Sequence, residues 1–276
     1  VYKRQVRQYG RVLQVGSQQR SDPAFRLACE LVRNGHLGKI KEVWVNVGPT
    51  SEECHLPGEP VPEGLDWDMW LGPAPWRTYS SVLAPPESFD GWPAWRYYRD
   101  YAGGGMDDFG AHHFDIAQWG LGTDDTGPVS VAPPDGKDID KLTYSYASGI
   151  KMYRGESHPK AAVEWFGERG RLRVNRGEYL ESEPAGIANG TIAANDIRLY
   201  KSDNHKDNWL EAVRYRKEPI CPVEVGAHTA IICHIGNIAY WLNRPLQWDP
   251  AKLEFVNDPE ANRMLARPNR APWQLV

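Results

Sequence analysis

The chain has 276 residues, which is enough for one large domain or two small ones with a buried core. Its 32 Lys and Arg residues against 36 Asp and Glu residues give a formal net charge of −4, so it has no basic field to hold nucleic acid or an anionic membrane. Hydrophobic residues at 41% and charged residues at 25% are typical of globular proteins. Four cysteines without a C-x-x-C pair argue against a zinc ribbon or a disulfide-dense scaffold.

A strand, a helix and a second strand are predicted in the amino-terminal part of the chain. The apolar run at residues 11–16 ends in glycine and predicts the first strand. Asp-Pro at 22–23 is a typical helix start, and Asn-Gly at 34–35 is a typical helix stop. Residues 40–47 alternate valine with more polar side chains, so they predict the second strand.

Residues 48–91 are rich in proline and glycine and show little periodicity, yet tryptophan is concentrated in and just after them. Large apolar rings need packing partners, so these tryptophans predict an ordered loop rather than a flexible linker. Their ring faces are also suited to stacking on a sugar, although a buried core is the commoner place for Trp. Five of the 12 tryptophans lie between Asp66 and Arg96: Trp67, Trp70, Trp76, Trp92 and Trp95.

The rest of the chain predicts an α+β fold. Short strands follow one another without intervening helices, which favours an antiparallel sheet: 129–132, 142–147, 151–153, 161–166 and 171–175, with a hairpin turn at 167–170. Two helices are expected to close the fold, at 204–216 with Trp209, Leu210 and Val213 inward, and within the uncharged run 225–243. We therefore expect a large, mostly antiparallel, open-faced sheet packed against helices.

The residues best suited to catalysis or ligand binding follow the glycine triplet 103–105. A helix is predicted from about Asp107 to Trp119, and it places Asp108, His112 and Asp115 at i, i+4 and i+7 on one face. A carboxylate next to an imidazole raises the pKa of the ring and orients it, as a group that takes a proton from a hydroxyl requires. The glycines would let the backbone approach a ligand closely.

Three interpretations of this segment remain open from spacing alone. The aspartates are suited to capping the helix, with the histidines buried and satisfied. Asp108, His112 and Asp115 are also suited to a divalent metal, although no further ligand cluster is evident. The third interpretation is general acid-base chemistry in a dehydrogenase-like or lyase-like site.

The triplet followed by Asp-x-Gly-x-His-x-x-Asp from Asp108 resembles the signature of the glucose-fructose oxidoreductase, inositol dehydrogenase and MocA family (Gfo/Idh/MocA). Stretches 15–40 and 66–75 resemble the same family. So does the pair of stretches 221–226 and 234–239, which, with 66–75, looks most like a bacterial subgroup common among sugar dehydrogenases. The resemblance spans nearly the whole chain.

The resemblance implies roles for individual residues. His112 would be the base or proton relay at the substrate hydroxyl, and Asp108 would orient it. Trp95 and Arg96 match a pair that touches the nicotinamide cofactor, NAD or NADP, in some members, although core packing and a salt bridge are the simpler roles for them. The resemblance further places cofactor contacts at Gln18 and Arg20, and substrate contacts at Asp115, His113 and Arg99; no metal is assigned.

Two motifs of the family are missing from this sequence. No G-x-G-x-x-G follows a strand, and no Glu-Lys-Pro motif is present. Two residues separate Gly105 from Asp108, where members usually have three. We therefore interpret residues 1–35 as a remnant of a Rossmann domain, with its last strand and helix, and residues 36–276 as the carboxy-terminal substrate and oligomerisation domain. Residues 1–5 resemble a translated sequencing-adaptor remnant, and we expect the chain to be truncated.

The resemblance implies an NAD(P)-dependent oxidoreductase acting on a sugar, a polyol or a related hydroxyl compound. The chain alone is expected to be inactive and to bind no dinucleotide tightly. A lyase or hydrolase that cleaves a glycoside through a keto intermediate, using a metal or a tightly bound cofactor, is an alternative, and a non-catalytic sugar-binding or assembly domain is another. We expect a cytoplasmic homo-oligomer that pairs through the open sheet face, with no nucleic-acid or membrane partner.

Overall fold

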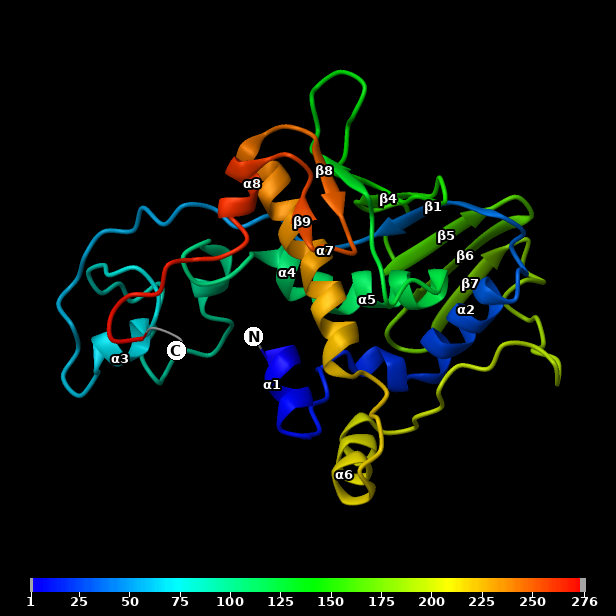
Figure 1. Ribbon diagram of the computed structural model, residues 1–276, viewed down its shortest axis with the longest axis horizontal. Helices are drawn as coiled ribbons and strands as arrows, with labels where there is room; N and C mark the ends of the chain where they lie inside the picture. The colour runs from blue at the N-terminus through cyan, green and yellow to red at the C-terminus, as the bar shows by residue number, and fades with distance from the viewer. Residues whose placement is uncertain (1, 274–276) are drawn as a thin grey trace.

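The computed structural model describes residues 2–273 as a mixed α and β structure (Figure 1). The helices are α1 (Tyr2–Gln8), α2 (Pro23–Arg33), α3 (Trp67–Leu71), α4 (Gly105–Asp108), α5 (Gly110–Leu121), α6 (His205–Tyr215), α7 (Val223–Leu242) and α8 (Pro259–Arg263), with 3-10 turns η1 (Gln18–Ser21) and η2 (Ala94–Tyr97). The strands are β1 (Ile40–Val45), β2 (Ser130–Ala132), β3 (Thr143–Ser145), β4 (Lys151–Arg154), β5 (Val163–Gly167), β6 (Gly170–Asn175), β7 (Tyr179–Glu183), β8 (Leu246–Asp249) and β9 (Glu254–Phe255).

Within residues 2–273 the strands form one nine-stranded sheet in the order β7-β6-β5-β1-β4-β3-β2-β8-β9. β1 pairs parallel with β4, with Val43 opposite Met152, and antiparallel with β5, with Val43 opposite Trp165. All other neighbours pair antiparallel. The expectation of a mostly antiparallel sheet is confirmed.

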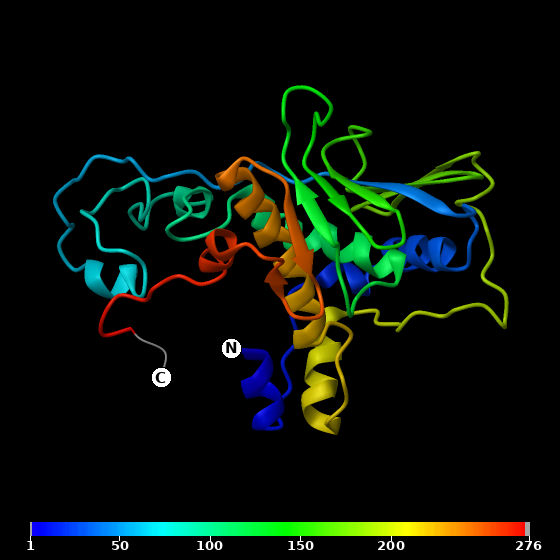
Figure 2. The same cartoon turned by 45° about the horizontal axis from the view of Figure 1, so that its top comes forward.

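Helices α2, α5 and α7 lie against one face of the sheet, and no helix in the described part of the chain covers the other (Figure 2). The two-residue alternation of a strand explains the division. In β1, Val43 and Val45 are fully buried toward the helices, whereas Glu42 and Trp44 between them are partly exposed. The helix side holds the main core, and the opposite face is open, as expected.

Residues 48–104, which we call the side lobe, form a second small core beside the sheet. Trp67 and Trp70 stack with ring centroids 4.6 Å apart, and Tyr79 meets Trp67 edge-on. The carboxy-terminal segment runs back along the lobe, where Arg270 binds Asp68 at 2.6 Å (Figure 1). The ordered loop predicted from the tryptophans is confirmed, although Trp76 and Trp92 stay 66% and 79% exposed.

Several elements differ from the expectations. In place of the strand expected at 11–16, the structure has a single bridge between Gln14 and Pro222. The helix expected from Asp107 is divided into α4 and α5 at Phe109. The inward side chains expected on α6 are exposed, since only Ala212 of that helix is buried. The sequence also missed β7, β8 and β9.

Residues 2–8 form α1 and pack beside α7, where Arg7 bridges Glu218 and Glu224. All four cysteines are buried and free, which agrees with the expected buried thiols. Among the described residues, none of the helices, α7 included, has both the length and the apolar character needed to traverse a bilayer.

Candidate functional site

The glycine triplet fixes the start of the candidate site against the chain that leaves β1. Gly104 has a φ of 75°, and a Cβ there would lie 2.6 Å from the backbone nitrogen of Ser51. A Cβ on Gly105 would lie 2.7 Å from the Cα of Gly48. Only glycine permits backbones to approach this closely. The triplet therefore serves chain packing, which seats α4 and α5. Gly103 and Gly104 also line a cavity, so the expected approach to a ligand stays a prediction.

His112 lies in the first turn of α5 and is half-buried. Its Nδ1 is 2.9 Å from the Oε1 of Gln19 in η1. With the Gln19 amide in this orientation its oxygen accepts from Nδ1, which assigns the proton of the neutral ring to Nδ1 and the lone pair to Nε2. Burial lowers the pKa of His112 below its ordinary value, the Arg176 guanidinium lowers it further, and Asp108 opposes both. The ring is thus neutral near pH 7, and the expected upward effect of the carboxylate is outweighed.

Asp108 ends α4 and has a 48% exposed side chain. The Nε of Arg96 lies 3.5 Å from its carboxylate, and the Arg96 guanidinium lies 5.0 Å from the centre of the Trp95 ring. The structure therefore brings together three of the expected site residues, Asp108, Arg96 and Trp95. No hydrogen bond joins Asp108 to His112 among residues 2–273, so Gln19 and not Asp108 orients the imidazole.

Arg20 and Asp115 form a buried ion pair on the side of α5 that faces η1. The Arg20 side chain is 2% exposed and Asp115 is fully buried. Nε and Nη2 of Arg20 donate to the two carboxylate oxygens at 2.7 and 2.9 Å, and Asp124 and Thr229 add further hydrogen bonds. Both residues were expected to contact ligands. Here they bind each other, so those ligand roles stay predictions.

His113 connects α5 to the end of β1. Its Nδ1 faces the carbonyl of Asn46, and its Nε2 accepts from Nη1 of Arg176 at 2.7 Å. Burial lowers the pKa of His113 to about 4. The ring is therefore neutral and engaged at both nitrogens, and the substrate contact expected for it stays a prediction.

Two adjoining cavities lie between α7, α8 and the side lobe. One, of about 610 Å³, is lined by Asp108, Arg96, Trp95 and residues of α7. The other, of about 750 Å³, is lined by Arg99, which was expected at the substrate. Arg99 also pairs with Glu53 at 2.8 Å. The two cavities share Trp95, Trp241 and Arg267 in their walls, and we refer to the two neighbouring cavities together as the cleft.

Sequence reasoning missed a polar group on α7 that faces α4. His234 lies 3.1 Å from a carboxylate oxygen of Asp107, and Asn237 donates to the other carboxylate oxygen at 2.8 Å. Asn237 also donates to the carbonyl of Gly103 at 2.9 Å. The i, i+3 spacing of His234 and Asn237 in an otherwise apolar helix was the available signal. Gln19 was missed as well, since its neighbour Gln18 was chosen as the cofactor contact. Gln18 is exposed, and its contact with a cofactor stays a prediction.

The described residues do not fit the phosphates of a dinucleotide. Arg20 is fully engaged by carboxylates, and no G-x-G-x-x-G loop is present. One observation fits a smaller polar group beside His112: Gln19 is 3% exposed, and its Nε2 has no hydrogen-bond partner among residues 2–273. A buried amide donor requires a partner, which a ligand atom would supply. Among the same residues no three His, Cys, Asp or Glu side chains are grouped to hold a metal ion.

Comparisons with known proteins agree on the fold. Residues 39–275 match the family model described as "Oxidoreductase family, C-terminal alpha/beta domain". Similar solved structures include an aldose-aldose oxidoreductase from Caulobacter crescentus complexed with glycerol, at 17% identity and a TM-score of 0.53. An NAD-binding protein from Listeria innocua is similar at 14% identity and 0.51, and GenD2 from gentamicin A biosynthesis, in complex with NAD, at 14% and 0.50.

The comparisons also define how much of those structures this chain represents. The alignments cover 87%, 88% and 89% of this chain and 65%, 65% and 67% of the respective structures. The chain thus spans about two thirds of their length. A comparison with curated proteins gives no match.

Proposed function

The chain belongs to the Gfo/Idh/MocA oxidoreductase family, and on this premise we propose that it is the substrate domain of an NAD(P)-dependent oxidoreductase that interconverts a hydroxyl and a carbonyl of a sugar or polyol. The similar structures named for an aldose oxidoreductase and for NAD complexes support the substrate class and the cofactor. Residues 1–35 are then the end of a Rossmann domain whose phosphate-binding loop is not in this sequence.

The observation that carries the proposal is the state of His112. Nδ1 is held by Gln19, and the ring is neutral, so Nε2 is a lone-pair acceptor at neutral pH. A general base needs this state and a pKa below the working pH. The hydroxyl proton of the substrate would pass to Nε2 of His112 as the carbonyl forms. A nicotinamide bound by the joined nucleotide domain would supply the acceptor for the hydride of the same carbon, and no step is assigned to it here because the described residues do not form its phosphate site.

Asp108 and Arg96 would act on the substrate rather than on the ring. Asp108 lines the cleft and is half exposed, so its carboxylate accepts hydrogen bonds from hydroxyls there, with Arg96 holding it in place. The unpaired Nε2 of Gln19 would donate to a substrate oxygen beside His112. Two alternatives remain, a lyase using a keto intermediate and a non-catalytic sugar-binding domain, and no observation of the site favours either.

The test is turnover by the protein in which this chain is joined to its nucleotide domain. With NAD or NADP and a set of sugars and polyols, we expect reduced nicotinamide to form, and His112→Asn to lower kcat by about a hundredfold or more. His55→Asn in the side lobe, where His55 is largely exposed, is the matched control. Full activity of His112→Asn would contradict the assignment. The chain alone is expected to give no turnover, and micromolar NADH binding by it would overturn that expectation.

We propose further that two copies pair through the open sheet face, in the cytoplasm. Trp44 and Tyr153 pack there with centroids 5.1 Å apart, with the Lys141 ammonium 5.0 Å from the Trp44 ring. Aromatic side chains are enriched at the centres of protein interfaces. Analytical ultracentrifugation should show a dimer or larger assembly that Trp44→Glu dissociates, while Trp209→Glu on exposed α6 leaves it intact. A monomer at all concentrations would rule this out.

A further inference from the structure

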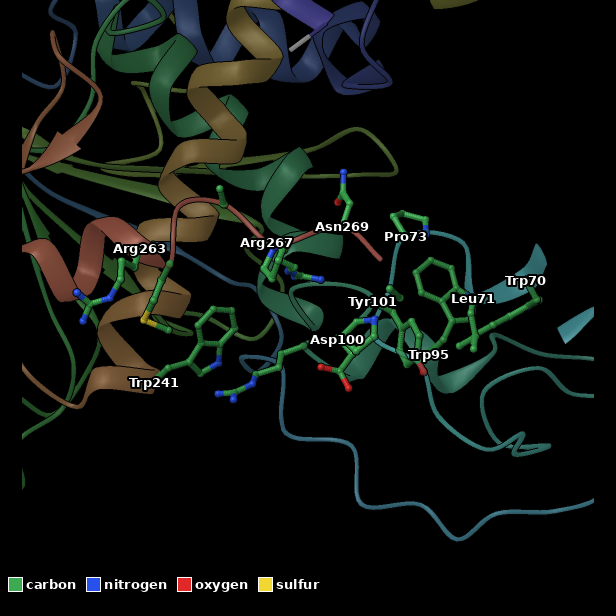
Figure 3. A pocket seen from close by; sticks show the side chains of 16 residues that line it. Trp70, Leu71, Pro73, Trp95, Asp100, Tyr101, Trp241, Arg263, Arg267 and Asn269 are labelled. Carbon is green, nitrogen blue, oxygen red and sulfur yellow. The ribbon is translucent and has the colours of Figure 1, made fainter. Parts of the chain in front are cut away.

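The larger cavity of the cleft is built from aromatic side chains of three separate segments. Trp70, Trp95 and Tyr101 come from the side lobe, Trp241 comes from α7, and residues 263–269 of α8 and the following tail complete the wall. In Figure 3, Trp241 and Arg263 lie on one side of the view and Trp95, Tyr101 and Trp70 on the other, with Arg267 between them. The cavity of about 750 Å³ is large enough for a monosaccharide or a small oligosaccharide.

The rings of this cavity are held in place by the protein. Trp70 stacks on Trp67 at 4.6 Å and meets Tyr101 edge-on at 5.4 Å. The indole nitrogen of Trp241 donates to the carbonyl of Ser51 at 3.0 Å. Rings fixed before a ligand arrives lose little entropy on binding, and their flat apolar faces match the C–H face of a pyranose.

The charges that line the cavity are mostly positive, although the chain as a whole is acidic. Arg99, Arg263 and Arg267 face it, against the single carboxylate of Asp100. Asp100 already pairs with Arg77 at 3.0 Å, and Arg99 with Glu53. Among residues 2–273 no carboxylate lies within salt-bridge distance of Arg267 or Arg263. Partial desolvation and the neighbouring Arg99 lower the pKa of Arg267, whereas Asp100 and Asp107 act to raise it, and the residue remains exposed to solvent.

We propose that this cleft binds an anionic sugar, with the pyranose face against the tryptophans and the carboxylate or phosphate on Arg267. A guanidinium matches the planar oxygens of a carboxylate or phosphate, and the aromatic walls select a sugar over a simple anion. Asp108 lines the adjoining cavity, so a sugar that extends from one cavity into the other meets this carboxylate, whereas His112 lies in the wall of neither. The inference rests on the proposed function for what happens to the ligand, but its binding needs no cofactor.

Isothermal titration calorimetry of the purified chain tests the proposal without catalysis. The probes are D-glucuronate and D-glucose 6-phosphate, with D-glucose as the neutral match and acetate and inorganic phosphate as anions without a ring. We expect at least one anionic sugar to bind about tenfold more tightly than D-glucose, acetate or phosphate, and the preference to shrink as salt is added. The comparison of the two anionic sugars tells a carboxylate site from a phosphate site.

Matched variants assign the two parts of the site. Arg267→Gln should remove the preference for the charged sugar and leave D-glucose unchanged, whereas Arg214→Gln on α6 should change neither. Trp70→Leu should weaken every sugar several-fold and Trp209→Leu none. Arg267 makes no hydrogen bond within residues 2–273, so its variant is expected to fold. The proposal would be overturned if D-glucose bound as tightly as both anionic sugars, if the simple anions did so, or if no saturable heat were seen. A failure of hydride transfer would leave these titrations unaffected.

Discussion

Asp108 ends α4 and Asp115 lies seven residues later in α5, and each faces an arginine, but their surroundings are opposite. Asp115 is fully buried and bound by both nitrogens of Arg20 at 2.7 and 2.9 Å. Asp108 is 48% exposed, lies 3.5 Å from Arg96 and lines a cleft. Both pairs join an arginine to an aspartate, but burial and the two-pronged hydrogen bonding of Asp115 separate a pair that stabilises the fold from one that can meet a substrate.

The contrast also explains how the amino-terminal segment is held. Arg20 in η1 lies 5.0 Å from the centre of the Trp119 ring and reaches two carboxylates, so it ties η1 to α5. Gln19, its neighbour, then reaches His112. The buried pair of Arg20 and Asp115 thus positions Gln19, which orients the proposed base. The exposed pair of Arg96 and Asp108 remains accessible to a ligand.

The largest expected effect is on stability. Asp115→Ala leaves the Arg20 charge buried with one partner fewer, so we expect the free energy of unfolding to fall by about 3–5 kcal/mol. Asp108→Ala removes an exposed pair and should cost less than about 1 kcal/mol. Urea unfolding followed by circular dichroism gives both values.

Equal losses of unfolding free energy in Asp115→Ala and Asp108→Ala would contradict the distinction between the buried and the exposed pair. Asp115→Ala combined with Arg20→Met replaces the buried pair by apolar groups and should recover part of the loss, because no fully buried charge is left unpaired and Asp124, the other partner of Arg20, is 29% exposed to water. If the double variant is less stable than Asp115→Ala, the arginine contributes more than its pairing with Asp115.

A smaller effect on stability is expected from His113, which is buried, whereas its neighbour His112 is only half-buried. The pKa of His113 is lowered from 6.5 to about 4 in the folded protein. Because the unfolded state binds this proton more readily, stability present above pH 6.5 is lost as the pH falls toward 4, by about 3 kcal/mol at most. In His113→Gln the pH dependence of the unfolding free energy should weaken in this window. Parallel curves for the two proteins would contradict the assignment.

The sequence predicted the interior of the sheet better than its edges. β1, β5 and β6 alternate apolar and polar side chains, so their periodicity is visible. β7 carries Glu181, Ser182 and Glu183 at one edge and has little apolar character, and β9 has two residues. The insertion of β1 between β4 and β5 joins segments more than a hundred residues apart, which local patterns do not encode.

The candidate site was predictable in its centre and not in its partners. The glycine triplet and the Asp-x-Gly-x-His spacing located Asp108 and His112. The choice between Gln18 and Gln19 depends on the 3-10 turn, which directs adjacent side chains to different sides. The pairing of Arg20 with Asp115 depends on how η1 packs on α5, so the sequence did not reveal it.

His112 is proposed here as a neutral base whose proton is held on Nδ1 by Gln19. Nitrogen-detected NMR of the histidine rings in this chain, assigned with His112→Asn and followed over pH, measures both properties directly. We expect a pKa below 6.5 for His112, with Nε2 unprotonated at pH 7, and we expect Gln19→Leu to remove the preference of the proton for Nδ1. A pKa at or above 6.5, or a proton on Nε2 at pH 7, would contradict it.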